Sequence, residues 1–222
     1  MGAVPTLAAV LWDLDGTIVD TEPYWFEAEY AVVERAGGRW SDAHAHAVVG
    51  SELLAAARYI RDHGPVDLEP AEIVRQLLEI VIARVKQRTP WRPGAVELLA
   101  QLRQAGVPCA LVTMSYTELA DAIVAQLPPG TFAAVITGDQ VRHGKPHPEP
   151  YLTAAAALGV QPQACVAIED SPTGIASAEA AGCRAVGVPH VAQILAAPGR
   201  TIIDRLDQID LAWLERIVSE SA

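Results

Sequence analysis

Residues 13–17, Asp13-Leu14-Asp15-Gly16-Thr17, stand directly after an apolar run at residues 7–12. Near-continuous apolar runs of this length are typical of strands that are buried on both faces of a parallel sheet. Ligands bind beyond the carboxyl ends of the strands in such sheets, and side chains two residues apart leave a strand on the same face. We therefore expect Asp13 and Asp15 to lie close together at a binding edge, where Gly16 permits a tight turn.

Further apolar runs alternate with helical patterns along the chain. Strands are predicted at residues 107–112, 132–136, 165–168 and 185–188, with a short one at 202–203. Helices are predicted at residues 95–105, 116–126, 150–158 and 172–181. Strand followed by helix, repeated in this way, predicts the α/β fold class with a doubly wound parallel sheet.

One long segment, residues 21–89, interrupts this alternation. Thr21 is a candidate N-cap for the first of its helices. The segment contains four helical patterns in succession and no strand pattern, at residues 23–36, 42–49, 52–63 and 69–88. The sequence therefore predicts a helical cap domain at residues 21–89, inserted into a core domain made of residues 1–20 and 90–222.

The composition limits the classes of partner. A formal net charge of −11 disfavours binding to nucleic acid or to an anionic membrane, and no apolar run is long enough to span a bilayer. The three cysteines form no CxxC motif and stand in apolar runs, which is typical of reduced, buried residues. We expect a monomeric, cytoplasmic protein that acts on a small molecule.

A second pair of acids, Glu169 and Asp170, ends the apolar run at residues 165–168. If this strand neighbours the first one, its acids converge with Asp13 and Asp15. Carboxylates that lie close together repel one another unless a cation or proton lies between them, and Mg²⁺ prefers oxygen ligands. The sequence thus predicts a magnesium site, with helix capping by Asp170 or Ser171 as the alternative.

Two further residues could hold a phosphate group. Lys145 is one of only two lysines and stands in Gly144-Lys145-Pro146-His147-Pro148, where it could offset the charge of a phosphate and of nearby aspartates; otherwise it is an exposed loop lysine. Thr113 ends the run at residues 107–112 and could cap the next helix, hold a phosphate, or do both.

These motifs in this order resemble those of the haloacid dehalogenase superfamily, and the helical insert resembles the cap of its β-phosphoglucomutase-like and sugar-phosphatase branch. The resemblance runs from about residue 8 to residue 210 and implies a Rossmann-like core. Four elements carry it: Asp13-x-Asp15-Gly16-Thr17, Thr113, Lys145 and Glu169-Asp170.

The resemblance also implies roles. Asp13 would attack phosphorus and form an aspartyl-phosphate, while Asp15 would first protonate the leaving alcohol and then activate water. Mg²⁺ would be held by Asp13, the Asp15 backbone carbonyl, Asp170 and Glu169. Lys145 would act in catalysis by steadying Asp13, and Thr113, Met114 and Lys145 would bind the substrate phosphate. Met114 departs from the family pattern, since many relatives carry asparagine or another small polar residue there.

The sequence therefore predicts a Mg²⁺-dependent phosphatase for a small phosphorylated metabolite such as a sugar or polyol phosphate. A β-phosphoglucomutase is the main alternative. That family carries a histidine where Trp25 stands and a phosphate-binding arginine shortly after a cap glycine, whereas Gly50 is followed by Ser51, Glu52 and Leu53. A non-catalytic binding or regulatory protein on the same fold is a further alternative, which the presence of both aspartates disfavours.

Overall fold

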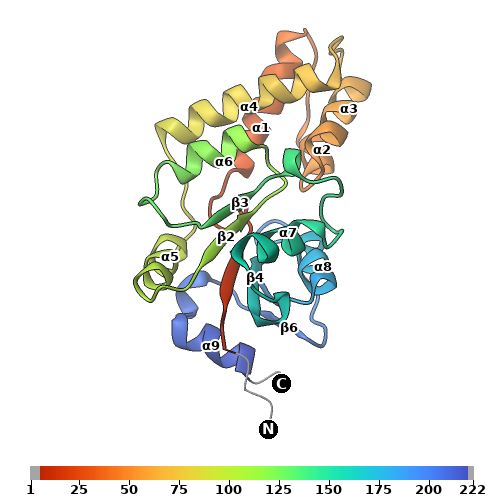
Figure 1. Ribbon diagram of the computed structural model, residues 1–222. Coiled ribbons are helices and arrows are strands. Elements are labelled where there is room, and N and C mark those ends of the chain that lie inside the picture. The colour runs from red at the N-terminus through yellow and green to blue at the C-terminus, as the bar shows by residue number, and fades with distance from the viewer. Residues whose placement is uncertain (1–5, 220–222) are drawn as a thin grey trace.

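The computed structural model describes residues 6–219, and its centre is a six-stranded sheet in which neighbouring strands are parallel (Figure 1). The strand order is β3-β2-β1-β4-β5-β6, so the first strand lies in the middle. The strands are β1 (Ala9–Trp12), β2 (Cys109–Val112), β3 (Ala134–Ile136), β4 (Cys165–Glu169), β5 (Arg184–Gly187) and β6 (Arg200–Ile202). The predicted doubly wound parallel sheet is confirmed.

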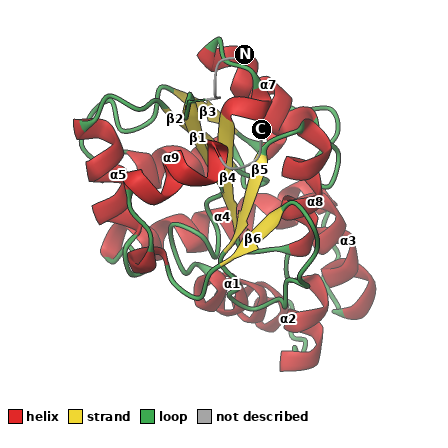
Figure 2. Ribbon diagram, turned by 90° about the horizontal axis from the view of Figure 1, so that it is seen from below, coloured by secondary structure: helices red, strands yellow, loops and turns green. Residues whose placement is uncertain are grey.

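Helices cover both faces of this sheet, as Figure 2 shows. Val10 and Trp12 of β1 pack in one cluster with side chains of α5 and α9, and Ala9 and Leu11 pack in another with α7 and α8. Successive side chains of a strand point to opposite faces, so burial on both sides explains the continuous apolar run. The helices outside the insert are α5 (Ala95–Gln104), α6 (Thr117–Val124), α7 (Glu149–Leu158), α8 (Pro172–Ala181) and α9 (Leu211–Ser219).

The last helix was not predicted, although Leu214 and Val218 stand at helical spacing and are buried in its core-facing side. Short 3₁₀ turns connect some of the other elements. They are Gly138–Gln140, Pro162–Ala164 and Leu206–Gln208.

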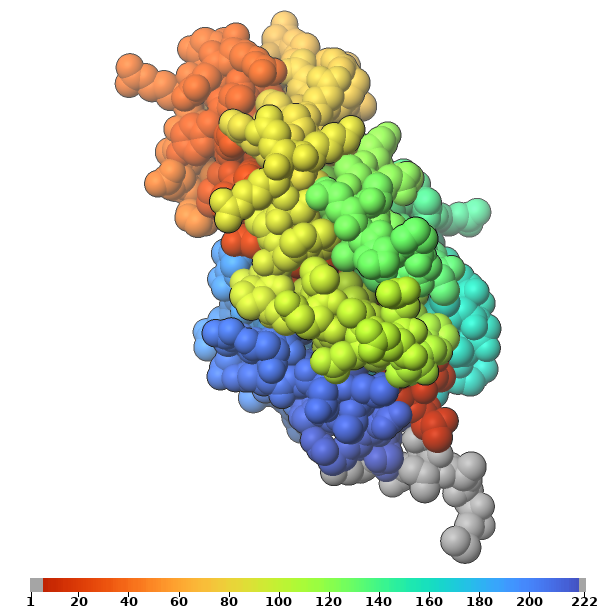
Figure 3. Space-filling model, turned by 90° about the vertical axis from the view of Figure 1, so that its left-hand side faces the viewer, coloured from red at the N-terminus to blue at the C-terminus, as the bar shows by residue number. Residues whose placement is uncertain are grey.

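The insert between β1 and α5 is helical, and its four helices end within one residue of the predicted bounds. They are α1 (Glu22–Arg35), α2 (Asp42–Val48), α3 (Leu53–His63) and α4 (Pro70–Gln87). Figure 1 shows them together beyond one end of the sheet. Figure 3 shows α4, in yellow, beside α6, in green, so the insert also packs on a helix of the sheet layer.

The chain leaves for the insert and returns from it at adjacent points. Val19 and Trp91 form an isolated antiparallel bridge, and the Asp20 N–H donates to the Pro90 carbonyl oxygen at 2.8 Å. These two crossings are the natural place for a hinge. The division into a cap at residues 21–89 and a core on either side of it stays a prediction.

The three cysteines lie in the interior of the protein. Cys109, Cys165 and Cys183 are buried and form no disulfide, and burial raises the pKa of the Cys109 thiol to about 12. The prediction of reduced, buried residues therefore agrees with the structure. Within residues 6–219, none of the helices combines the length and the apolar character needed to cross a bilayer.

Candidate active site

The carboxyl ends of three neighbouring strands form the candidate site. β1 pairs with β2 on one side and with β4 on the other, and the winding of the sheet reverses at this position. Asp13 follows β1, Thr113 follows β2, and Asp170 follows β4. Because open α/β sheets bind ligands where the strand order reverses, the motifs predicted from the sequence meet where a ligand is expected.

Lys145 reaches this edge from the loop before α7. Its ammonium nitrogen, on a side chain only 6% exposed, donates to Asp13 Oδ1 at 2.7 Å, to Glu169 Oε1 at 2.6 Å and to the Val112 carbonyl oxygen at 2.8 Å. An ammonium group has three hydrogens, so these acceptors use all of them. The two carboxylates raise the pKa of Lys145 against the opposing effect of burial, and the alternative of an exposed loop lysine is wrong.

Three carboxylates crowd this edge. Oxygen atoms of Asp13, Glu169 and Asp170 lie within 4.8 Å of one another. Burial raises the pKa of Asp13 to about 7 and that of Asp170 well above its usual value. Asp13 Oδ2 is buried without a hydrogen-bond partner among the described residues. Such a cluster is costly unless a cation or protons balance it.

Gly16 leaves room for the Asp170 carboxylate beside the turn that follows β1. Its φ of +84° confirms the tight turn that the sequence predicts, in a region that favours glycine. A Cβ atom at Gly16 would also stand 2.0 Å from Asp170 Oδ2. The glycine is therefore required for the turn and for the space that the carboxylate occupies.

Glu169 is fully buried and held by side chains on three sides. In addition to the bond from Lys145, Tyr151 Oη donates to its Oε1 at 2.7 Å and Ser171 Oγ donates to its Oε2 at 3.1 Å. A Cβ atom at Gly174 would lie 1.9 Å from this carboxyl group. Ser171 also caps α8, since its Oγ accepts from the Gly174 N–H at 3.0 Å, so Asp170 is free of the capping role.

Asp15 is held by donors from both sides of the cavity. Ser115 Oγ donates to Oδ2 at 2.6 Å, with the Thr113 hydroxyl at 3.4 Å, and the Thr21 hydroxyl donates to Oδ1 at 2.5 Å. Trp25 Nε1 on α1 lies 3.5 Å from the same Oδ1. Thr21 occupies the N-cap position of α1 but makes no side-chain capping bond. The predicted N-cap position is confirmed, but the hydroxyl binds Asp15 instead of capping the helix.

Thr113 and Met114 line the cavity, but Thr113 does not lie at the start of the next helix. α6 begins only at Thr117 with Tyr116 at its N-cap position, so Thr113 does not cap it. The Thr113 hydroxyl instead accepts from the Ser115 N–H at 3.0 Å. Met114 Sδ accepts from the Lys145 N–H at 3.3 Å. The methionine thus packs against the loop that carries the lysine.

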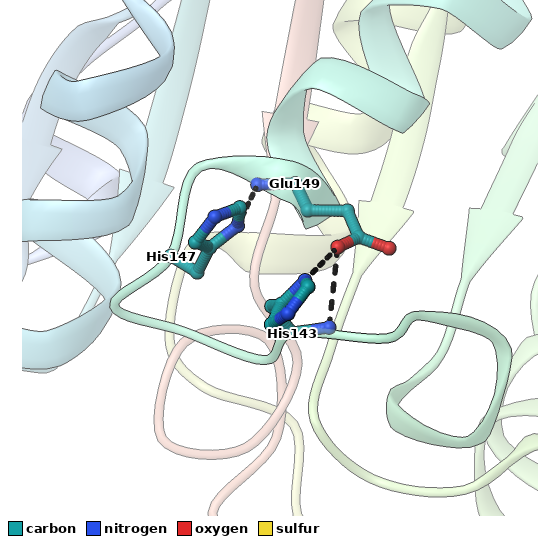
Figure 4. Close-up of side chains that lie close together, drawn as sticks. All are labelled: His143, His147 and Glu149. Atoms are coloured by element: carbon teal, nitrogen blue, oxygen red, sulfur yellow. Dashed lines mark hydrogen bonds and ion pairs between the residues drawn. The ribbon is translucent and has the colours of Figure 1, made fainter.

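The loop that presents Lys145 is closed by Glu149 (Figure 4). The Glu149 carboxylate accepts from the Arg142 N–H at 2.8 Å, from the His143 N–H at 3.2 Å and from His143 Nδ1 at 2.8 Å. His147 Nδ1 accepts from the Glu149 N–H at 3.2 Å. The centroids of the two imidazole rings lie 4.6 Å apart, with the ring planes tilted by 35°, so these residues fix the shape of the loop.

One cavity of about 240 Å³ connects this edge to the insert. The insert contributes side chains of α1, α3 and α4 to its lining, including Glu29, Leu53 and Leu77. Glu169 is fully buried and does not line the cavity. The predicted site residues that line it are Asp13, Asp15, Thr113, Met114, Lys145 and Asp170.

Several contacting residues were not found from the sequence. Thr21, Ser115 and Tyr151 each bond to a predicted carboxylate. A sequence signal exists for one of them, since a tyrosine within an apolar helical pattern needs a partner for its hydroxyl. The partners of the other two depend on the tertiary structure.

A sheet edge that combines two aspartates after the first strand with a buried lysine and a further acidic pair defines a class of hydrolase. A family model described as haloacid dehalogenase-like hydrolase matches residues 7–182. The chain belongs to this family, and it is a phosphatase.

Individual relatives agree with the family. Hexitol phosphatase A of Escherichia coli is 36% identical over 212 residues, which cover 90% of this chain and 88% of the relative. Fructose-1-phosphate phosphatase YqaB of Escherichia coli is 34% identical, covering 82% of this chain and 96% of the relative. The crystal structure of CbbY from Rhodobacter sphaeroides in complex with phosphate superposes with a TM-score of 0.85 at 26% identity, covering 94% of this chain and 99% of that one.

Proposed function

We propose that this phosphatase hydrolyses a small phosphomonoester, a sugar or polyol phosphate, through an aspartyl-phosphate and with Mg²⁺. One observation carries the proposal. Asp13 and Asp15 line the same cavity but have different partners. Asp13 accepts from Lys145 at Oδ1 and has no partner at Oδ2, whereas Asp15 is held in place by hydroxyl donors. Two carboxylates in such different surroundings suit different chemical roles.

The residues present fit a magnesium ion. Three clustered carboxylates supply hard oxygen donors, and the unpartnered Asp13 Oδ2 needs a cation or a donor. Asp13, Asp170 and the backbone carbonyl of Asp15 would hold the ion. Glu169, whose oxygens already accept three side-chain hydrogen bonds, would contribute mainly its charge. Bound there, Mg²⁺ neutralises phosphate charge and aligns the phosphoryl group.

In the first half-reaction the Asp13 carboxylate attacks phosphorus. A bond forms between an Asp13 oxygen and phosphorus, and the bond from phosphorus to the ester oxygen breaks with its electron pair going to that oxygen. Asp15 gives its proton to this oxygen, so the leaving group departs as a neutral alcohol. Lys145 stays bound to Asp13 and balances negative charge throughout.

In the second half-reaction water attacks phosphorus of the aspartyl-phosphate. Asp15, now a carboxylate, takes the proton from the water, and the bond between Asp13 and phosphorus breaks. Inorganic phosphate leaves, Asp13 is again a carboxylate, and Asp15 is again protonated. Thr113 and the Met114 N–H are the candidate phosphate ligands, because they follow β2 and line the cavity. Lys145 also lines it, and it would bind a phosphate oxygen directly only by giving up one of its three hydrogen bonds.

The test of the covalent route is Asp13→Asn, which keeps the size of the side chain but removes its nucleophilicity. We expect phosphate release from p-nitrophenyl phosphate to fall by at least about 10³-fold, with an unchanged far-ultraviolet circular dichroism spectrum. The matched control is Asp67→Asn, at an exposed position on the insert, which should retain full activity. Substantial turnover by Asp13→Asn would rule out Asp13 as the nucleophile.

A mutase is the second candidate, because mutases are found on this fold. It is disfavoured because Trp25 replaces the family's histidine and because the cavity lining contains no arginine. With β-glucose 1-phosphate as substrate we expect glucose and free phosphate. Stoichiometric formation of glucose 6-phosphate with little free phosphate would instead establish a mutase.

A further inference from the structure

Helix α1 presents one face to the cavity. Glu22, Trp25 and Glu29 stand at positions i, i+3 and i+7 of this helix and all line the cavity. Along the helix axis, Glu22 and Glu29 are about 10 Å apart at 1.5 Å per residue. Glu22 begins the helix directly after the Thr21 that bonds to Asp15, so Glu29 lies at the end that is remote from the catalytic aspartates.

Glu29 is buried to an extent that is unusual for a glutamate. The residue is only 5% exposed, and Trp40 Nε1 donates to its Oε2 at 3.0 Å. Within residues 6–219, no hydrogen bond or ion pair to Oε1 is found. Burial raises the pKa of Glu29 to about 8. Taking a carboxyl group out of bulk water costs free energy, and an apolar residue would fill the same space at lower cost, so packing does not account for Glu29.

Apolar side chains form part of the cavity wall that the insert contributes. They are Leu53, Ala56 and Leu77. Ligand sites typically combine apolar walls with a few polar groups that fix orientation. Glu29 therefore has the surroundings of a recognition group.

The charge of the cavity limits what can bind at this end. Glu22 and Glu52 line the cavity together with Glu29. Lys145 is the sole lysine or arginine among the lining residues, and its ammonium group is already bound to Asp13 and Glu169. A second phosphate or a carboxylate on the leaving group would lose water there and find no free cation to replace it, which is unfavourable.

We propose that Glu29 is a binding subsite for hydroxyl groups of the leaving alcohol, so that the cavity selects an uncharged, polyhydroxylated leaving group over one that carries a second anion. This inference rests on the proposed phosphatase reaction and identifies a residue that would recognise the substrate of that reaction. Trp40 acts as a positioning residue, since its indole N–H holds one oxygen of Glu29 and leaves the other for the ligand.

The test compares two substrates in two variants. Glu29→Met removes the polar group at similar length, and Glu29→Gln keeps a polar group of the same size. We expect Glu29→Met to lower kcat/KM for a hexitol 6-phosphate at least about tenfold, the loss of a hydrogen bond, and to lower kcat/KM for p-nitrophenyl phosphate, which has no hydroxyl for this subsite, by a clearly smaller factor. Glu29→Gln should retain more hexitol phosphate activity than Glu29→Met. The matched control is Glu34→Met on the exposed side of α1, which should leave kcat/KM for both substrates unchanged.

The parent protein gives a second measurement that does not depend on a variant. It should prefer hexitol 6-phosphate at least tenfold over n-hexyl phosphate, which lacks the hydroxyls, and over a hexitol bisphosphate. Equal rates for these substrates would overturn the subsite, and so would an equal effect of Glu29→Met on both test substrates. Hydrolysis of p-nitrophenyl phosphate without hexitol phosphate activity would overturn the subsite alone. Absence of both activities in the parent would reject the phosphatase proposal itself.

Discussion

Gly174 is placed within α8, where glycine is less favourable than alanine by about 1 kcal/mol. Helix propensity alone would therefore make Gly174→Ala stabilising. The new methyl group would, however, stand 1.9 Å from the Glu169 carboxyl group, which is enclosed by Lys145, Tyr151 and Ser171. In a close-packed interior the steric conflict outweighs the propensity.

We expect Gly174→Ala to lose at least about 100-fold in kcat, because Glu169 and with it Lys145 must move, and to unfold at a lower temperature than the parent. The measurements are steady-state kinetics and thermal unfolding. Ala176→Gly, at an exposed position of the same helix, is the control and should keep its activity. A Gly174→Ala variant that is both more stable and fully active would contradict this account of Glu169.

Asp170 is the residue whose loss should weaken metal binding most selectively. It belongs to the carboxylate cluster and, unlike Asp13, it is not hydrogen-bonded to Lys145. We expect Asp170→Ala to raise the Mg²⁺ concentration for half-maximal activity at least about tenfold, and we expect chelator to abolish activity in the parent. Titration of activity with MgCl₂ measures both. Full activity of the parent in excess chelator would refute the metal site.

At the scale of elements, the loop between β3 and α7 depends on the carboxylate of Glu149. Its pKa is held below the usual value by hydrogen bonds from the Arg142 N–H and from His143. A group whose pKa is lower in the folded protein stabilises it above its ordinary pKa, and this contribution is lost as the pH falls through the folded value. The loop should therefore loosen in acid, below the ordinary glutamate value of 4.5.

Glu149→Ala should remove that contribution at every pH. We expect faster hydrogen exchange at the Arg142 and His143 amides, together with a lower kcat because Lys145 is less well positioned. Exchange measured by mass spectrometry on parent and variant checks the first expectation. Unchanged protection of both amides in the variant would show that Glu149 does not close the loop.

The local pattern of apolar residues explains why the helices and strands could be predicted from the sequence, whereas some contacts of the site could not. β1 and its neighbour β4 carry continuous apolar residues, and the motif acids stand at the ends of these two strands, so one rule about sheet edges brings Asp13 and Asp170 together. The donors to Asp15 come from residues 6 and 100 positions away along the chain. Such pairings leave no periodic trace, which is why Thr21 was predicted as a cap and Glu29 was not singled out.

At the scale of the whole molecule, His190 joins the two crossings to the insert. Arg92 Nη1 lies 2.8 Å from His190 Nδ1, and His190 Nε2 lies 2.9 Å from Asp20 Oδ1. A guanidinium can only donate, so Nδ1 accepts and the proton on Nε2 is donated to Asp20. The imidazole therefore bridges the outgoing and returning segments, between which the predicted cap would pivot.

His190→Ala should lower the free energy of unfolding by about 1 kcal/mol, because two charge-assisted hydrogen bonds at a partly exposed site are lost. Chemical denaturation measures this change. His190→Gln can still accept from Arg92 through its oxygen and donate to Asp20 through its amide, so it should recover most of the loss. If both variants unfold like the parent, the bridge does not stabilise the hinge. The predictions of a monomer and of a cytoplasmic location stay predictions.

The central position of β1 has a consequence for synthesis on the ribosome. β1 emerges first, yet Ala9 pairs with Cys165 and Val10 with Cys109, so the sheet cannot close around its middle until β4 has left the exit tunnel. Helices α1 to α4 need only local contacts and can form in the meantime. Until β4 emerges, β1 keeps at least one unpaired edge, and this apolar strand is the segment that a chaperone would be expected to bind.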